Sequence, residues 1–381
     1  MEESRNISHK VTCNKDTNKK LVEKIMDNLD NYLKERSLSD SLWIKAISSQ
    51  YFLIEIAYIM NLTETNSYQE LEEEFLNTSC VFRKGVVQPS PQKILVVPDE
   101  NEKLIDRMKQ EDDAGADYPN RLRASRINTK AKKDRIFYNY YYGLMAGIIN
   151  ILCTSNVYLE NYEKIRMAVI AEIFNPDAID EAGGWIHFRL PWMTARILIS
   201  LSSYSDETIQ QLISGKAFSK TKINSIESYH DFINQASRSL VTRLHGKSIW
   251  GSGAGDWVTC WESTGLCLEA LFSLGVINDY IKDVKKIINF LFLEENIREW
   301  LVTPSFIDEI SSNRTLSSVI LSSVVYRLMS NGVIETDENI KNLIEGLFLT
   351  ISTEILRINN ERVQQYCTIP QIIYYIIKAL L

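Results

Sequence analysis

The segment GSGAGDWVTCWESTGLCLEALFSLG, Gly251–Gly275, decides the fold of this chain. It opens with glycines, which favour a turn, and passes through Trp257 and Trp261 into a nearly unbroken run of small and apolar residues. A helix whose apolar residues lie on every side is buried all round rather than half exposed. The segment therefore predicts a turn followed by a helix in the interior of the protein.

Five other segments repeat this order of features with decreasing fidelity. Two are close: SLWIKAISSQYFLIEIAYIM from Ser41 and GGWIHFRLPWMTARILISL from Gly183. Three are weaker: RIFYNYYYGLMAGIINIL from Arg135, NRTLSSVILSSVVYRLM from Asn313 and QYCTIPQIIYYIIKALL from Gln365. Amphipathic helices lie between them, at 18–35, 160–174, 225–244, 279–294 and 337–357, with a poorly marked one before Arg135.

An amphipathic helix that alternates six times with an apolar one predicts two concentric rings. The apolar helices form the inner ring, and the amphipathic helices cover it and face water. We therefore expect an all-α protein, an (α/α)6 toroid of six hairpins, in which residues 1–381 form a single domain.

Composition agrees with a large folded core and excludes several classes of protein. Of the 381 residues, 45% are hydrophobic, which rules out a disordered chain, and the net charge is −7. No sustained basic face is present, so we expect no nucleic-acid partner. No window approaches the roughly 18 apolar residues of a membrane span, and the polar N-terminus lacks a signal core. The six scattered cysteines form no CxxC pair, which favours a reduced, cytoplasmic protein. The oligomeric state stays open.

The repeat resembles that of a known superfamily. In Gly251–Gly275 a glycine-rich turn and an aromatic residue precede a helix of Ser/Thr, small and apolar residues, as in the prenyltransferase and squalene-cyclase-type, terpenoid cyclase-like toroids. Gly183–Leu201 resembles that repeat more loosely. The resemblance implies an α/α toroid with a central, often apolar, ligand cavity, and it does not by itself imply an activity.

One long segment interrupts the repeat. Residues 77–133 contain two strand-like runs, CVFRKGVV and KILVVP, around the turn-forming QPSPQ, and we expect an inserted loop or a small β-hairpin there. An acidic stretch, Glu111–Asp117, follows, and then a basic one. The insertion is either a loop over one mouth of the toroid or a solvated surface loop.

The motifs that give the resembled family its chemistry are missing. The chain has no DxDD motif, with which class II terpenoid cyclases protonate an alkene or epoxide. The acidic stretch has a DDxxxD spacing, one residue longer than a magnesium-binding DDxxD, and Gly115 and Pro119 break the helix. Asp256 and Cys260 have the spacing of two zinc ligands, but only His187 is near enough to be a third. We therefore predict no metal and no cofactor.

The residues around the two best repeats are the candidate site. As catalytic residues we expect Asp256 and Glu262, and the alternatives are that Asp256 caps its helix and that Glu262 pairs with Arg189 or Arg196. Glu55 and Glu269 have the same ambiguity as paired acids in buried helices. For substrate binding we expect aromatic and polar side chains near the starts of inner helices: Trp185, Trp192, Trp257, Trp261, Tyr140, Tyr141, Arg189 and His187.

Three functions remain open at this stage. The first is acid-type chemistry on an isoprenoid or other small apolar ligand in a central cavity. The second is a non-enzymatic toroid that binds a ligand or a protein partner and has lost the catalytic motifs. The third is a carbohydrate-active hydrolase or lyase with paired carboxylates from Asp180, Glu181, Asp256 and Glu262.

Overall fold

The computed structural model describes residues 15–35, 47–78, 81–83, 86–88, 129–155, 159–176, 191–244, 249–251, 260–302, 304, 310–358 and 368–381. Helices account for nearly all regular structure in these ranges, so the all-α prediction is confirmed. Within them no helix has both the length and the apolar character needed to cross a membrane.

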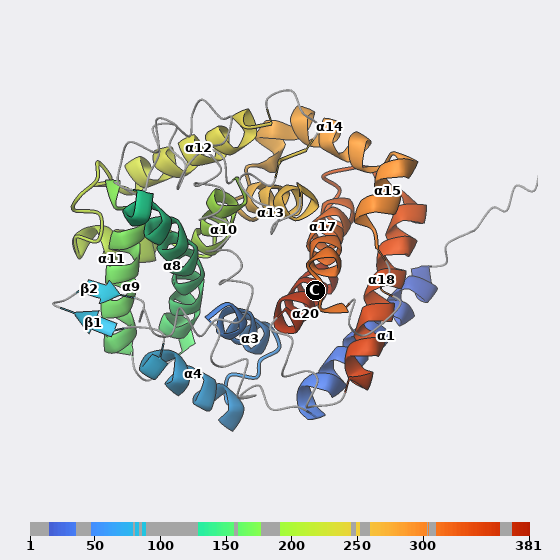
Figure 1. Cartoon of the computed structure of the whole chain (residues 1–381), viewed down its shortest axis with the longest axis horizontal. Coiled ribbons are helices and arrows are strands. Elements are labelled where there is room, and N and C mark those ends of the chain that lie inside the picture. Colours follow the sequence, from blue (N-terminus) through green and yellow to red (C-terminus); the bar gives the residue numbers. More distant parts are fainter. Residues whose placement is uncertain are drawn as a thin grey trace, which may run out of the picture.

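Within the described ranges, six buried helices contact one another in a closed order. They are α3 (Ile47–Ile59), α8 (Thr129–Ser155), α10 (Pro191–Leu201), α13 (Cys260–Ser273), α17 (Asn313–Ser330) and α20 (Ile369–Leu380). Each packs against the next along the chain, and α20 packs against α3. Figure 1 shows these helices around the middle of the molecule, with the first and the last of them side by side.

The remaining helices lie outside this set (Figure 1). They are α1 (Lys15–Glu35), α4 (Asn66–Thr78), α9 (Leu159–Ile173), α11 (Asp206–Ser214), α12 (Ile226–Thr242), the short 3-10 helix η2 (Ile277–Tyr280), α14 (Ile281–Leu291), α15 (Glu294–Trp300) and α18 (Glu338–Arg357). Along the described chain, an outer helix or group of outer helices precedes every inner helix. Among the described residues, α4 is the outer helix that lies before Arg135 in the sequence.

Burial explains why the two kinds of sequence separate. In α13 every residue from Glu262 to Leu271 is buried, and α17 is buried from Thr315 to Met329 except for Arg327. In α14, by contrast, the buried residues are Val284, Ile287, Ile288 and Leu291, which form one stripe. The inner helices therefore have no polar face to turn to water, and only a covered position can accommodate them.

Neighbouring inner helices run in the same direction where two levels of their contact are described. Between α17 and α20, Thr368 donates to Ser311 just before the two helices begin, and Ser323 donates to Tyr375 further along. Between α3 and α20, Tyr51 lies against Tyr374 and, one turn later, Glu55 lies near Lys378.

At one level of the α13–α17 contact, Gly265 meets Ile320 and Leu321, and further along both helices Glu269 pairs with Arg327. This parallel arrangement fits the order of elements, because the outer helix or group of outer helices between two inner helices brings the chain back to the end where the next inner helix begins. The first residues of the inner helices thus lie at one end of the inner set.

A short β-hairpin occurs in the inserted segment, but not where its turn was predicted. Strands β1 (Val81–Arg83) and β2 (Val86–Gln88) pair antiparallel, with Phe82 opposite Val87. β1 and the first two residues of β2 belong to the run CVFRKGVV, which the sequence pattern predicts to be one strand, and β2 ends at Gln88 just beyond it. Two residues separate them, the shortest usual hairpin connection, and they include a glycine. The second expected strand, at 93–98, lies outside the described residues.

Candidate functional site

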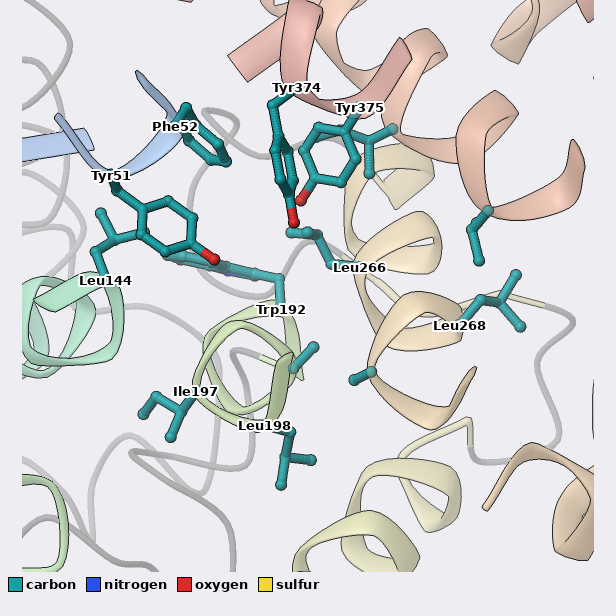
Figure 2. Packing of buried hydrophobic residues seen from close by; sticks show 14 of the residues in the cluster. Tyr51, Phe52, Leu144, Trp192, Ile197, Leu198, Leu266, Leu268, Tyr374 and Tyr375 are labelled. Atoms are coloured by element: carbon teal, nitrogen blue, oxygen red, sulfur yellow. The ribbon is translucent and has the colours of Figure 1, made fainter. Parts of the chain in front are cut away.

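Four aromatic side chains meet between α3 and α20, and we call them the aromatic cluster: Tyr51, Phe52, Tyr374 and Tyr375. The ring centroids of Tyr51 and Phe52 are 4.8 Å apart, those of Phe52 and Tyr374 5.2 Å, and those of Tyr374 and Tyr375 5.0 Å. All four are at most 4% exposed. Figure 2 shows them directed into the space that α10 and α13 also border. The cluster is a packed layer inside the closed set of helices.

The phenols of this cluster are neutral donors. Burial raises the pKa of Tyr51 and Tyr374 well above the ordinary tyrosine value, and nearby Glu55 raises both further. Burial likewise raises the pKa of Tyr375 to about 12. These residues therefore offer ring faces and hydroxyl groups, but no negative charge, across the physiological pH range.

A buried ion pair borders the aromatic cluster. Arg196 of α10 places Nη2 3.4 Å from Oε1 of Glu262 at the start of α13, and both side chains are more than nine-tenths buried. The Arg196 guanidinium carbon lies 5.9 Å from the centroid of the Phe52 ring. The alternative in which Glu262 pairs with Arg196 is therefore confirmed.

A second charged group, the ionic cluster, joins Glu55, Glu269, Arg327 and Lys378 from four inner helices. Arg327 Nη1 lies 2.7 Å and 2.6 Å from the two carboxylate oxygens of Glu269, and Lys378 Nζ lies 2.8 Å from Oε1. Ser273 also donates to this oxygen. Burial opposes the charge of Glu269, but Lys378 and Arg327 outweigh it and hold the pKa of Glu269 below its usual value.

Glu55 behaves differently from Glu269, although both belong to the ionic cluster. Burial raises the pKa of Glu55, and the charge of Lys378 together with a hydrogen bond from the Tyr51 hydroxyl offsets only part of this effect. Glu55 follows Tyr51 by four residues, and Lys378 follows Tyr374 by four. One helical turn thus separates the aromatic cluster from the ionic cluster, which lies toward the C-terminal ends of the inner helices.

The structure describes only some of the predicted site residues. Trp192 is 1% exposed and packs in the core, whereas Trp261 is half-buried at the second position of α13. Tyr140 and Tyr141 lie on α8, but their side chains are outside the described residues. The other predicted site residues, Trp185, His187, Arg189, Asp256 and Trp257, also lie outside them, in segments that precede α10 and α13. Their roles stay predictions.

Sequence reasoning missed the cations of the ionic cluster. Their signal was present, because Lys378 and Arg327 each interrupt an otherwise apolar run, as Glu269 does. A charge inside a buried helix requires a partner, so these three residues were candidates for one another. Among the described residues, no group of three or more histidine, cysteine, aspartate and glutamate side chains could hold a metal ion.

Comparison of the sequence with protein-family models and with curated proteins, and of the chain with solved structures, found no match. The candidate site is therefore interpreted from its own residues.

Proposed function

We propose that the six hairpins form an (α/α)6 toroid of the terpenoid-cyclase type, which binds an apolar, isoprenoid-like substrate at the end where the inner helices begin. The closed order of inner-helix contacts supports the toroid, because a six-membered ring of parallel helices needs each helix to touch two neighbours. This ring encloses the packed aromatic cluster.

The single observation that carries the location is the shared direction of the inner helices. Because these helices are parallel, their first residues lie at one end of the set, and Trp185, Asp256 and Trp257 come shortly before α10 and α13 in the sequence. Beneath this end lie the aromatic cluster and the Arg196–Glu262 pair, which would form the floor of a site. Aromatic ring faces stabilise a developing cation in an apolar substrate.

In this proposal Asp256 is the acid that starts the reaction. Glu262 is less suited to donate a proton, because Arg196 beside it stabilises its charged form. Glu262 would instead hold Arg196 in place at the floor of the site. The substrate would be a polyene whose double bond accepts the proton, and the aromatic cluster would favour the resulting positive charge.

Product analysis tests this proposal. Purified protein is incubated with squalene and, separately, with geranylgeranyl diphosphate, and extracts are examined for cyclised or isomerised products by gas chromatography and mass spectrometry. We expect product from the wild type, at least about 100-fold less from Asp256→Asn, and unchanged product from Asp231→Asn, an exposed position on α12. Equal turnover by wild type and Asp256→Asn would contradict the role of Asp256.

A second candidate is a binding module without catalysis, and the pairing of the ring's acids favours it. Glu262 and Glu269 each lie against a cation, and the four side chains of the aromatic cluster are at most 4% exposed. This candidate predicts that the wild type quenches its tryptophan fluorescence on binding a polyene but forms no product. A pull-down with and without residues 77–133 then tests whether a protein partner uses the inserted segment.

The carbohydrate-active alternative stays a prediction, because Asp180, Glu181 and Asp256 lie outside the described residues.

A further inference from the structure

Two buried glutamates lie outside the ring centre, on outer helices. Glu345 of α18 is 0% exposed, and Glu72 of α4 is 7% exposed. Within the part of the chain that the structure describes, neither takes part in an ion pair, in contrast to Glu262 and Glu269, which each lie against a cation. Both face a tyrosine instead, and that shared environment determines their chemistry.

At Glu345 one carboxyl oxygen has a partner and the other has none. The Tyr326 hydroxyl of α17 donates to Oε1 at 2.9 Å, and Oε2 is buried without a hydrogen bond. The charged groups that act on this carboxyl are Lys341 and Glu338, both on α18 itself, and their effects have opposite signs. A carboxylate in this position would be buried with a single neutral donor, which is costly.

Glu72 has an even poorer set of partners. The Tyr162 hydroxyl of α9 faces it and lowers its pKa by less than burial raises it, and neither that hydroxyl nor Oε1 of Glu72 makes a hydrogen bond of ordinary geometry. The other titratable group nearby is Tyr68, one turn earlier on α4. A proton on Glu72 would remove the buried charge and would give the carboxyl group a donor of its own toward the Tyr162 oxygen.

We propose that Glu72 and Glu345 are kept as neutral carboxylic acids inside the fold, so that folding takes up protons and the protein is more stable in mildly acidic than in alkaline solution. The two residues would then act together as a pH-sensitive element of the outer layer. Ionisation of Glu345 would weaken the contact of α18 with α17, and ionisation of Glu72 would weaken the contact of α4 with α9.

The direction of the pH dependence follows from the pKa shifts. Burial raises the pKa of both carboxyls above the ordinary glutamate value of 4.5. Below 4.5 the folded and unfolded states are both protonated, and the stabilisation is fully present. It is lost as the pH rises through the raised value of the folded state, because the unfolded chain ionises first.

Urea unfolding of Glu72→Gln, Glu345→Gln and the double variant, measured at about pH 5 and about pH 8, tests the proposal. Glutamine has the shape of glutamate and cannot ionise. In the wild type, each glutamate should change the folding equilibrium constant by up to about tenfold per pH unit over the range in which it titrates, and its glutamine variant should lack that change. Relative to the wild type, both variants should therefore gain stability at pH 8. Glu73→Gln, an exposed position beside Glu72, is the matched control and should leave the pH dependence unchanged.

A second measurement keeps the test decisive where a variant fails to fold. Refolding of the wild type in weakly buffered solution near pH 6, followed with an indicator dye, should show proton uptake that is smaller in each glutamine variant that folds. Equal pH dependence in the wild type, both glutamine variants and Glu73→Gln would overturn the proposal. Refolding of the wild type without proton uptake would overturn it equally.

Discussion

At the scale of single residues, the buried acids of this chain divide by the partner that each one has. Glu269 is 1% exposed and lies against Arg327 and Lys378, and its pKa is lowered. Glu345 lies against a phenol, and its pKa is raised. Between these two acids, the cations that α17 and α20 bring to Glu269 make the difference, since desolvation raises the pKa of both.

Replacement of Glu269 by glutamine should destabilise the protein strongly. Arg327 and Lys378 would lose the carboxylate that they share, and we expect the free energy of unfolding to fall by about 3 kcal/mol. This is the low end for a broken buried pair, because both cations keep nearly one fifth of their surface exposed. Because the pKa of Glu269 is lowered, its contribution to stability is present above pH 4.5, the ordinary pKa of glutamate, and is lost as the pH falls through the pKa of the folded state. The stability of the variant should therefore change less with pH in acid. Urea unfolding at about pH 7 and about pH 3 measures both effects, with the exposed Glu299→Gln as control; equal stability of the two variants would contradict the assigned pairing.

How much of the candidate site was predictable also depends on single residues. The partnership of Glu262 with Arg196 was among the stated alternatives, because both charges occur in segments that the repeat places in neighbouring hairpins. The partners of Glu269 were not predicted, since Arg327 is 58 residues away and nothing in the repeat specifies which helical turns meet. Register between helices depends on close packing, to which the apolar pattern is insensitive.

At the scale of elements, the pattern of apolar residues predicted the kind of helix better than its ends. The outer helix expected at 337–357 is Glu338–Arg357, where Asp337 accepts hydrogen bonds from the amides of Asn339 and Ile340 as an N-cap. The inner helix expected from Arg135 begins at Thr129 instead, because the charged residues before Arg135 carry no apolar signal although they favour a helix. Capping residues and helix propensity therefore set the ends of the helices, and the pattern of apolar residues does not report either of them.

Two helical glycines differ in the space around them, so replacement by alanine should have opposite effects on stability at the two positions. At Gly265 a new Cβ would lie 2.9 Å from Cγ2 of Ile320 and 3.0 Å from the backbone nitrogen of Leu321, so Gly265→Ala should cost about 1–3 kcal/mol. Gly346 of α18 is exposed with nothing within 4 Å, so Gly346→Ala should stabilise the helix by about 0.5–1 kcal/mol. Thermal unfolding of the two variants compares them directly; a neutral Gly265→Ala would contradict the tight α13–α17 contact.

At the scale of the whole molecule, the two ends of the described chain complete the structure. Helix α1 packs against α18 and α3 against α20, and Asn28 of α1 donates to Thr353 of α18 at 3.2 Å across 325 positions of sequence. The inner set is therefore closed by its first and last members (Figure 1). Such closure makes every inner helix depend on two neighbours, so removal of one should affect all of them.

Deletion of residues 368–381, which removes α20, should abolish cooperative unfolding of the entire chain. Ile372, Ile373, Ile376 and Ile377 are all 0% exposed. Burial of one such side chain contributes about 1.5–3 kcal/mol, so the loss of four approaches or exceeds the whole stability of an ordinary domain, about 5–15 kcal/mol. The faces of α3 and α17 against α20 would also reach water. Circular dichroism during heating and size-exclusion chromatography measure the outcome. Removal of Leu381 alone, which is 73% exposed, should change neither result. A truncated chain that stays monomeric and unfolds at the wild-type midpoint would show that the other five inner helices are stable without closure.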